Sequence, residues 1–139
     1  MKTKFIAAFL AIIALLAVIP LTASGAANDA IAPYWQNTGV VSCKIGFSDD
    51  GYGYAEAHVM GHPTANKIKA DVYVYRQVGS AWVYVGEEHK TVNSSSLTIS
   101  CKFNSIEGAY YRADYTLVVT KNGVDETITN TVYKTCPTK

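Results

Sequence analysis

The sequence predicts an all-β domain, a seven-stranded antiparallel sandwich of two sheets, and three observations support this. Seven short stretches alternate apolar and polar side chains with the period of two that a half-buried strand requires. Turn-forming residues separate these stretches at intervals of about 8–12 residues, the spacing typical of sandwiches. No long window after Ala27 has the period of an amphipathic helix. A closed barrel is the alternative arrangement of the same strands.

Residues 1–27 have the pattern of a secretory signal peptide. A short basic start is followed by the uncharged apolar run 5–21 and then by small residues. The small residues allow cleavage after Gly25 or after Ala27. A retained membrane anchor is the alternative, but the run is shorter than the roughly 20 apolar residues that a spanning helix needs. We therefore expect residues 28–139 to be a single secreted domain with no stable membrane span after cleavage.

The first three predicted strands, 40–47, 52–60 and 67–75, each place every second side chain on one face. The segments between them, 48–51 and 61–64, contain Gly, Asp and Pro, which favour turns. The expected inward residues are Val41, Cys43, Ile45 and Phe47, then Ala55, Ala57 and Val59, then Ile68, Ala70, Val72 and Val74.

Four further strands are expected at 81–85, 97–103, 111–119 and 124–132. Gly79-Ser80 predicts a turn before the first of them, and Asn122-Gly123, the strongest short hairpin signal, precedes the last. The phase of 81–85 is unsettled, and Trp82 is expected in the core. The other inward residues are Leu97, Ile99, Cys101 and Phe103, then Tyr111, Ala113, Tyr115, Leu117 and Val119, and finally Val124, Ile128 and Val132.

The segment from Gly108 to Ala113 resembles the start of the penultimate strand in immunoglobulin and fibronectin type III domains. In those folds a tyrosine begins this strand, and its hydroxyl bonds back to the preceding loop as a tyrosine corner. Tyr111 matches this tyrosine by its inward phase, and Tyr110 is the competitor. Ala113 stands where immunoglobulins have their second cysteine. The resemblance implies an immunoglobulin-like sandwich without the immunoglobulin disulfide.

Other short strings extend the resemblance over nearly all of residues 28–139. Trp35 to Thr38, Val74 to Arg76, Gly79 to Val85 and Val119 to Gly123 are similar to a group of small secreted domains of unknown function from Gram-positive bacteria. That resemblance implies a secreted bacterial β-sandwich and no activity. The stretch from Trp35 to Ser42 also resembles the start of lactococcin 972-type bacteriocins, which makes a secreted toxin the alternative function.

Export would place the three cysteines in an oxidising setting, where a disulfide can persist. In an immunoglobulin-like sandwich the first and fifth strands share a sheet with the second between them. Two strand spacings are about 9.6 Å, beyond the Cα separation of about 4.4–6.8 Å that a bridge tolerates. That spacing disfavours Cys43–Cys101 and favours Cys43–Cys136, with Cys101–Cys136 as the rival.

The sequence contains no motif that places catalytic groups, and we expect a protein that is not an enzyme and has no cofactor. No Gly-x-Ser-x-Gly nucleophile elbow surrounds any serine. Glu56, His58 and His62 could approach a zinc ion, but solvated polar side chains are the better interpretation, so no metal site is expected. The formal net charge of +1 gives no electrostatic reason to expect nucleic acid as a partner.

Outward-facing aromatic residues are the one feature that suggests binding. Tyr73 and Tyr75 have outward phase on the third predicted strand, and Tyr84 lies across the next turn. Tyr52 and Tyr54 are outward on the second strand. Exposed rings can stack on sugars or form the hot spot of a protein interface. We expect a monomeric binding module that uses Tyr73, Tyr75 and Tyr84 to bind a glycan, cell-wall material or a surface protein; the alternative is cross-strand pairing alone.

Overall fold

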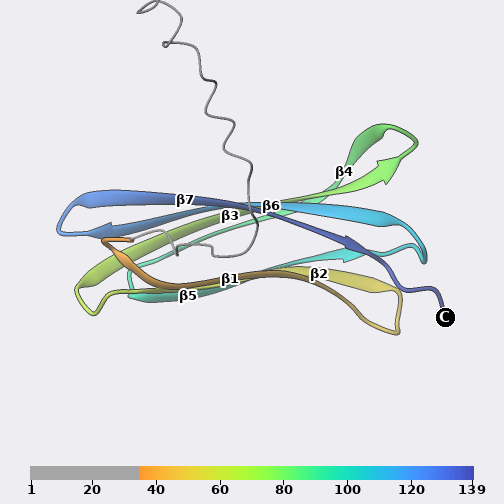
Figure 1. Ribbon diagram of the computed structural model, residues 1–139. Helices are drawn as coiled ribbons and strands as arrows, with labels where there is room; N and C mark the ends of the chain where they lie inside the picture. The colour runs from red at the N-terminus through yellow and green to blue at the C-terminus, as the bar shows by residue number, and fades with distance from the viewer. Residues whose placement is uncertain (1–34) are drawn as a thin grey trace, which may run out of the picture. The chain divides into compact units, whose positions relative to one another are not determined.

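The computed structural model describes residues 35–139; the predicted signal peptide lies outside these residues. The described part contains seven strands and no helix, so the all-β prediction is confirmed (Figure 1). None of it could cross a membrane as a helix. The strands are β1 (Thr38–Phe47), β2 (Tyr52–Gly61), β3 (Ala65–Val78), β4 (Ala81–Val92), β5 (Ser96–Asn104), β6 (Tyr110–Lys121) and β7 (Val124–Thr135).

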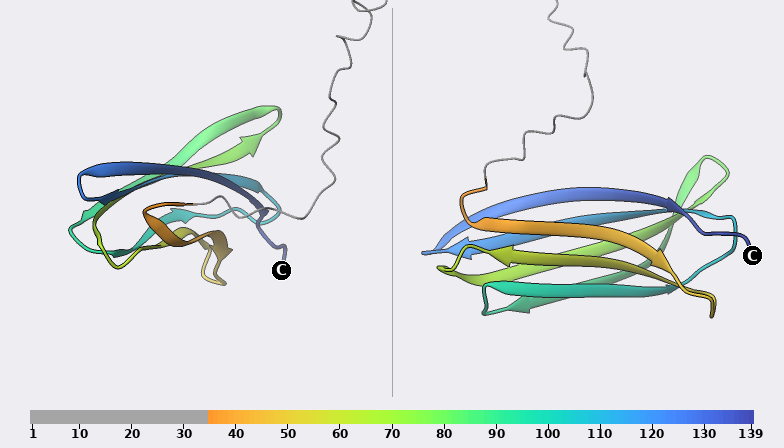
Figure 2. Two further views of the ribbon diagram at one scale, coloured as in Figure 1. Left: turned by 60° about the vertical axis from the view of Figure 1, so that its left-hand side comes forward. Right: turned by 60° about the horizontal axis from the view of Figure 1, so that its bottom comes forward.

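The strands form two antiparallel sheets that face each other, as Figures 1 and 2 show. One sheet has the order β1-β2-β5 and the other β4-β3-β6-β7, which confirms a sandwich over a closed barrel. In constant-type immunoglobulin domains the fourth strand joins the sheet of the first, second and fifth. Here β4 pairs with β3 instead, which enlarges the sheet that carries the outward tyrosines.

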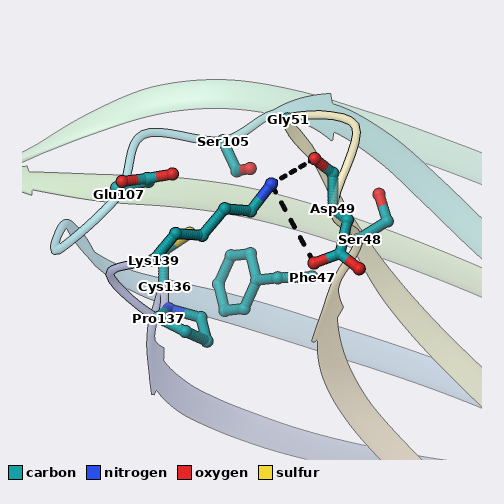
Figure 3. A pocket seen from close by; sticks show the side chains of 9 residues that line it. All are labelled: Phe47, Ser48, Asp49, Gly51, Ser105, Glu107, Cys136, Pro137 and Lys139. Atoms are coloured by element: carbon teal, nitrogen blue, oxygen red, sulfur yellow. Dashed lines mark hydrogen bonds and ion pairs between the residues drawn. The ribbon is translucent and has the colours of Figure 1, made fainter.

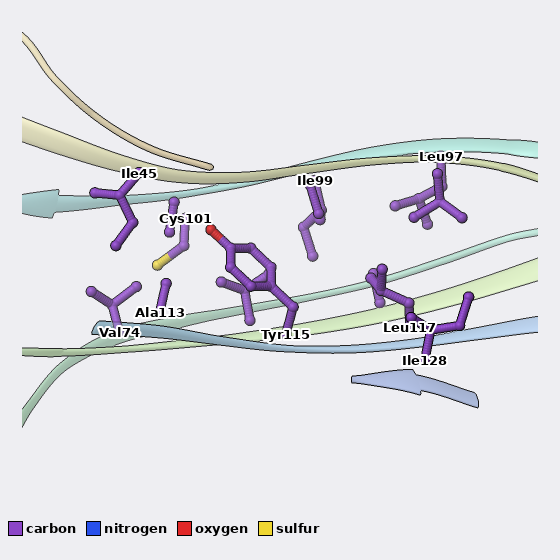
Figure 4. Close-up of a cluster of buried hydrophobic side chains, with 14 of the residues drawn as sticks. Ile45, Val74, Leu97, Ile99, Cys101, Ala113, Tyr115, Leu117 and Ile128 are labelled. Carbon is purple, nitrogen blue, oxygen red and sulfur yellow. The ribbon is translucent and has the colours of Figure 1, made fainter. Parts of the chain in front are cut away.

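The core fills the space between the sheets, and Tyr115 stands at its centre (Figure 4). This side chain starts on β6 and is fully buried, and its hydroxyl donates a hydrogen bond to the carbonyl oxygen of Lys44 in β1 at 2.8 Å. Burial raises the pKa of Tyr115, so the hydroxyl keeps its proton. Several inward side chains of the core are small: Ala55, Ala57, Ala70 and Ala113 are buried.

The predicted alternation is confirmed along β2, β3, β5 and β6, where every second residue is buried. Two expectations differ. Val124 is 65% exposed because it closes the β6–β7 hairpin with Lys121, beyond the end of the core. β4 continues past residue 85 to Val92, although the residues opposite the buried Val74, Val72 and Ala70 are Gly86, Glu88 and Lys90. An edge strand at the margin of the core can carry polar residues there, and only Val85 and Val92 pack partly against the core.

The predicted Asn122-Gly123 hairpin is confirmed. Asn122 has φ 53° and Gly123 has φ 76°, the two positive values of a type I′ turn. The turn fixes the register in which Lys121 faces Val124 and, further along, Arg112 faces Tyr133. A two-residue turn therefore determines which side chains of β6 and β7 are neighbours.

The predicted tyrosine corner forms at Tyr111. Its side chain is fully buried, and its hydroxyl accepts a hydrogen bond from the backbone N–H of Ile106 at 2.9 Å. Tyr110 is 38% exposed and faces the other way. The bond joins the start of β6 to the loop that follows β5, so it fixes the crossing between the two sheets.

We expect Tyr111→Phe to lower the free energy of unfolding by about 1–3 kcal/mol, because the Ile106 N–H would lose its partner in a part-buried site. Tyr110→Phe is the matched control and should change stability by less than about 0.5 kcal/mol. Urea unfolding of the two variants checks this. Equal stability losses would show that the corner bond contributes nothing.

The segment before β1 is held by Glu126 of β7. One carboxylate oxygen accepts hydrogen bonds from the Asn37 N–H at 3.1 Å and the Thr38 hydroxyl at 2.7 Å, and the other from the Gln36 N–H at 2.6 Å. Burial raises the pKa of Glu126, but these hydrogen bonds outweigh it and hold the pKa below its usual value of 4.5. Asn37 in turn donates to the carbonyl oxygens of Val119 and Val124 at 3.0 and 2.9 Å.

We expect Glu126→Ala to lower the free energy of unfolding at pH 7 by about 1–3 kcal/mol, since three donors lose a charged acceptor that is partly exposed. A depressed folded-state pKa adds stability that is present above pH 4.5 and is lost as the pH falls through the folded value. The difference in the free energy of unfolding between the parent and Glu126→Ala should therefore shrink in acid. Urea denaturation at several pH values measures this difference, and Glu88→Gln, at an exposed position, is the control. A difference that does not change with pH would contradict this role for the Glu126 charge.

The three cysteines are free thiols, so the expected Cys43–Cys136 bridge and its rival Cys101–Cys136 are both absent. The Cys43–Cys136 prediction was wrong because of where β7 lies beside β1. Contacts run along β1 from Thr38 with Glu126, through Cys43 with Asn130, to Ile45 with Lys134. Cys136, just past the end of β7, lies six residues or about 20 Å of extended strand beyond Asn130, near Phe47 and not near Cys43. β2 separates Cys43 from Cys101, as expected. Burial raises the pKa of the Cys43 and Cys101 thiols.

Candidate binding surface

Cross-strand pairing gathers aromatic side chains from four strands on the outer face of the β4-β3-β6-β7 sheet. Tyr75 of β3 lies opposite Tyr84 of β4 and opposite Arg112 of β6, and Arg112 lies opposite Tyr133 of β7. Residues directly opposite on antiparallel strands share a face, so these four form one row across the sheet. With two adjacent rings they make what we call the aromatic surface: Tyr75, Trp82, Tyr84, Tyr110, Arg112 and Tyr133.

The rings of the aromatic surface contact one another. Tyr110 and Tyr133 are stacked with centroids 5.9 Å apart and an interplanar angle of 18°. The Trp82 ring lies 5.9 Å from each of them, and Tyr75 meets Tyr84 edge-on at 6.3 Å. These separations lie in the range of favourable aromatic pairs, each worth about 0.5–1.5 kcal/mol beyond burial. The rings therefore hold each other in place.

Arg112 lies at the centre of these rings. Its guanidinium carbon is 4.5 Å from the Tyr75 ring centroid and 5.0 Å from that of Trp82, which are cation–π distances. One terminal nitrogen makes an ion pair with Asp114 at 3.1 Å, and the side chain is 23% exposed. Its Nε is buried and has no hydrogen-bond partner among residues 35–139. A planar cation, matched by one carboxylate, thus occupies the middle of the surface.

The β3–β4 hairpin brings Trp82 to this surface. The register between the two strands shifts between Val74 and Tyr75, which marks a bulge, and bulges bend and twist a strand. Beyond it the hairpin turns at Gly79, with φ 61°, and rises from the outer side of the sheet (Figures 1 and 2). The Trp82 ring therefore contacts Tyr133, although β4 and β7 are the two opposite edges of the sheet.

The three tyrosines predicted for binding all lie on this outer face. Tyr75 and Tyr84 belong to the aromatic surface, and Tyr84 is 54% exposed. Tyr73 lies one step further along β3, where its ring meets His89 at 5.4 Å. Tyr52 and Tyr54 are on the outer face of the opposite sheet, near the Lys102 amino group. The outward tyrosines of the sequence therefore form two separate groups.

Four members of the aromatic surface were not predicted from the sequence: Trp82, Tyr110, Arg112 and Tyr133. Trp82 was expected in the core, yet it is only partly buried and faces outward. Side chains two residues apart on a strand share a face, so Trp82 lies on the same face as Tyr84, and this signal was overlooked. Tyr133 follows the inward Val132, so its outward phase was also readable. The position of Arg112 beside Tyr75 depends on the register of β3 with β6, which no local pattern reports.

A cluster of charged side chains lies on the same face, beyond Tyr73. His89 Nδ1 is 2.7 Å from an Asp71 carboxylate oxygen, and Lys69 contacts the other oxygen at 3.1 Å. The hydrogen bond to Asp71 raises the pKa of His89, with a smaller contribution from Glu87 at 3.6 Å. Burial raises the pKa of Asp71, but bonds and charges from His89 and Lys69 outweigh it and lower the value.

We expect the His89 imidazole to titrate above its usual pKa of 6.5, and Asp71→Asn to return it toward that value. A raised folded-state pKa means that the His89–Asp71 pair adds stability below pH 6.5, and that this stability is lost as the pH rises through the folded value. NMR titration of the imidazole proton signals in both forms measures this. A His89 pKa at or below 6.5 in the parent protein would contradict the His89–Asp71 pair.

Polar side chains also gather at two other places, and one of them is an open hollow of about 340 Å³ on the outer face of β1 and β2. Glu56 makes an ion pair with Lys44 at 2.8 Å and His58 contacts the Thr98 hydroxyl at 3.0 Å. No group of three or more metal-binding side chains occurs in residues 35–139. A pocket of about 90 Å³ between Phe47, Cys136 and Lys139 is closed by the Lys139–Asp49 contact (Figure 3). Ligand pockets usually measure about 300–1,000 Å³, so it is too small for one.

Comparison with known proteins identifies no family. No family model and no curated protein matches this sequence. Among solved structures, a protein from Archaeoglobus fulgidus is 13% identical, with 73% of this chain and 98% of that one covered and a TM-score of 0.40. OgpA from Akkermansia muciniphila, in complex with an O-glycopeptide, is 13% identical over 78% of this chain and 33% of its own, with a TM-score of 0.39.

A third similar structure is a glycosyl hydrolase family 2 member from Bacteroides cellulosilyticus. It is 8% identical over 67% of this chain and 14% of its own length, with a TM-score of 0.36. This chain therefore spans about a third or less of the two glycan-related proteins. At such identities and TM-scores the likenesses carry no inference about what this protein binds, and its surface chemistry has to be argued from its own residues.

Proposed function

We propose that this protein is a secreted, non-catalytic binding module whose ligand site is the aromatic surface. The observation that carries the proposal is the convergence of five rings and Arg112 from four strands on one outer face. Tyr, Trp and Arg are the residues most enriched in binding hot spots. A glycan, cell-wall material or a surface protein is the proposed class of partner, and the signal-peptide pattern supports a site of action outside the cell.

Exposure of the rings supports binding over a purely structural role. Tyr84 and Tyr133 are 54% and 51% exposed, and Tyr110 is 38% exposed, so much of their apolar area faces water. Pairing across strands stabilises a sheet by only about 0.2–1 kcal/mol per pair and does not require so large an exposed cluster. Neither the surface nor any comparison favours the bacteriocin alternative.

The test compares two double variants in a pull-down with whole cells, isolated peptidoglycan and polysaccharides. Tyr84→Ser/Tyr133→Ser removes the two most exposed rings of the aromatic surface, and Tyr52→Ser/Tyr54→Ser removes the tyrosines of the opposite sheet. We expect the first variant to reduce retention at least about tenfold, equivalent to about 1.4 kcal/mol, and the second to leave it unchanged. Thermal unfolding of both verifies that they remain folded.

Retention that is equal in the two variants, or that is lost only in Tyr52→Ser/Tyr54→Ser, would refute a binding role for the aromatic surface. The two changes delete the same chemical groups from opposite sheets. A difference in retention therefore reports the location of the site and not a general loss of tyrosines.

A further inference from the structure

We infer that the ligand is an uncharged polysaccharide chain that lies along β3 and β6, from the aromatic surface to the polar row around Asp71 and Thr116. This inference rests on the proposed function and adds the class and the direction of the ligand. It is carried by three features of the outer face: the neutralised centre of the aromatic surface, the polar rows beyond it, and the balance of charges along them.

The charges at the centre of the aromatic surface, those of Arg112 and Asp114, already neutralise each other. Arg112 occupies the place between the Tyr75 and Trp82 rings where a ligand cation would bind, which removes an ammonium ligand from consideration. The Asp114 carboxylate, 3.1 Å from the guanidinium, opposes an anionic ligand at the same place. Remaining guanidinium donors and carboxylate acceptors lie side by side, which suits the hydroxyl groups of a neutral sugar whose apolar face rests on the rings.

The outer face continues from the rings as two rows of polar side chains. Two residues of strand advance about 6.6 Å, so the second row lies about 13 Å from Arg112, the length of several sugar units. The first row consists of Glu87, Tyr73, Asp114 and Thr131, and the second of His89, Asp71, Thr116 and Thr129.

These rows suit a carbohydrate better than a protein partner. Neither row contains an aliphatic side chain, whereas the centre of a protein interface is depleted of charged residues. The rows instead present ordered donors and acceptors: the Thr131 hydroxyl donates to Asp114 at 3.0 Å, and His89 contacts Asp71 at 2.7 Å. Hydroxyl groups of a chain laid along the strands would meet such groups at successive steps.

Charges of both signs lie along this path and pair with one another. Lys69 pairs with Asp71, His89 lies between Asp71 and Glu87, and Arg112 pairs with Asp114. A polyanion such as an acidic polysaccharide binds to a face with one sign of charge, and its binding weakens with salt. A neutral chain has no such requirement, and it is the polymer that this face fits.

The experiment measures the affinity of residues 28–139 for neutral oligosaccharides of two and of six units by isothermal titration calorimetry. The probes are cello-, xylo-, manno-, malto- and chito-oligosaccharides, with oligogalacturonides as the charged comparison. For one neutral series we expect the six-unit chain to bind at least about tenfold tighter than the two-unit chain, with little change at high salt.

Variants separate the two ends of the path. Thr116→Val/Thr129→Val keeps the shape and strand propensity of both residues and removes their hydroxyls from the far row. It should remove the advantage of the six-unit chain and leave two-unit binding unchanged, whereas Tyr84→Ser/Tyr133→Ser should weaken both. Thr98→Val, on the opposite sheet, is the control and should change neither.

Four results would overturn the inference and leave the proposed function standing. They are equal affinity for two and six units, stronger binding to oligogalacturonides that salt weakens, aromatic-dependent capture of a protein alone, and aromatic-dependent retention on cells with no binding to any neutral series. If Tyr84→Ser/Tyr133→Ser binds every ligand as the parent does, the proposed function itself fails.

Discussion

The register of the β4-β3-β6-β7 sheet is the constraint on which the rest of this structure depends. Each of the inner strands β3 and β6 must turn every second side chain to the core, where Val74 and Ala113 lie opposite each other and are fully buried. The next residues on each strand, Tyr75 and Arg112 among them, are then neighbours on the outer face. A slip of one residue would reverse the two faces and expose the core, so burial of the core also specifies the outer row.

Arg112 connects this geometry to the proposed function. Its contacts with Tyr75, Trp82 and Asp114 order a side chain that is normally flexible, and each cation–π contact is worth about 0.5–2 kcal/mol, depending on solvent exposure. Rings that already contact one another lose little further freedom when a ligand arrives. Preordering of this kind improves affinity because ordering a mobile side chain on binding costs about 0.5–1.5 kcal/mol.

Local patterns predicted most of the fold and only part of the aromatic surface. The alternation of apolar and polar residues predicted the inward residues of β2, β3, β5 and β6. Asn122-Gly123 predicted the β6–β7 hairpin, and the inward phase of Tyr111 predicted the tyrosine corner. The length of β4 was missed because its inward positions Gly86, Glu88 and Lys90 are not apolar, so no alternation marks the strand. Val124 was wrongly predicted to face inward because the apolar pattern of β7 continues beyond the end of the core.

The remaining errors share a physical cause. The cysteine pairing and the neighbours of Tyr75 depend on how far one strand slides past another, a long-range property that a short sequence window does not contain. Tyr73 and Tyr75 were placed on the outer face because outward phase is a local property, and Tyr84 was grouped with them because it follows across the next turn. Arg112, which lies between Tyr75 and Tyr133, became visible only once the register of β3, β6 and β7 was known.

The most direct measurement is an NMR titration of isotope-labelled residues 28–139 with the cell-wall or polysaccharide fraction that retains them. The Trp82 indole N–H and the Arg112 Nε–H are well-separated reporters at the centre of the aromatic surface. We expect both signals to shift in a saturable manner, with further changes along β3 and β6. Shifts confined to β1, β2 and β5, with these two signals unmoved, would contradict it.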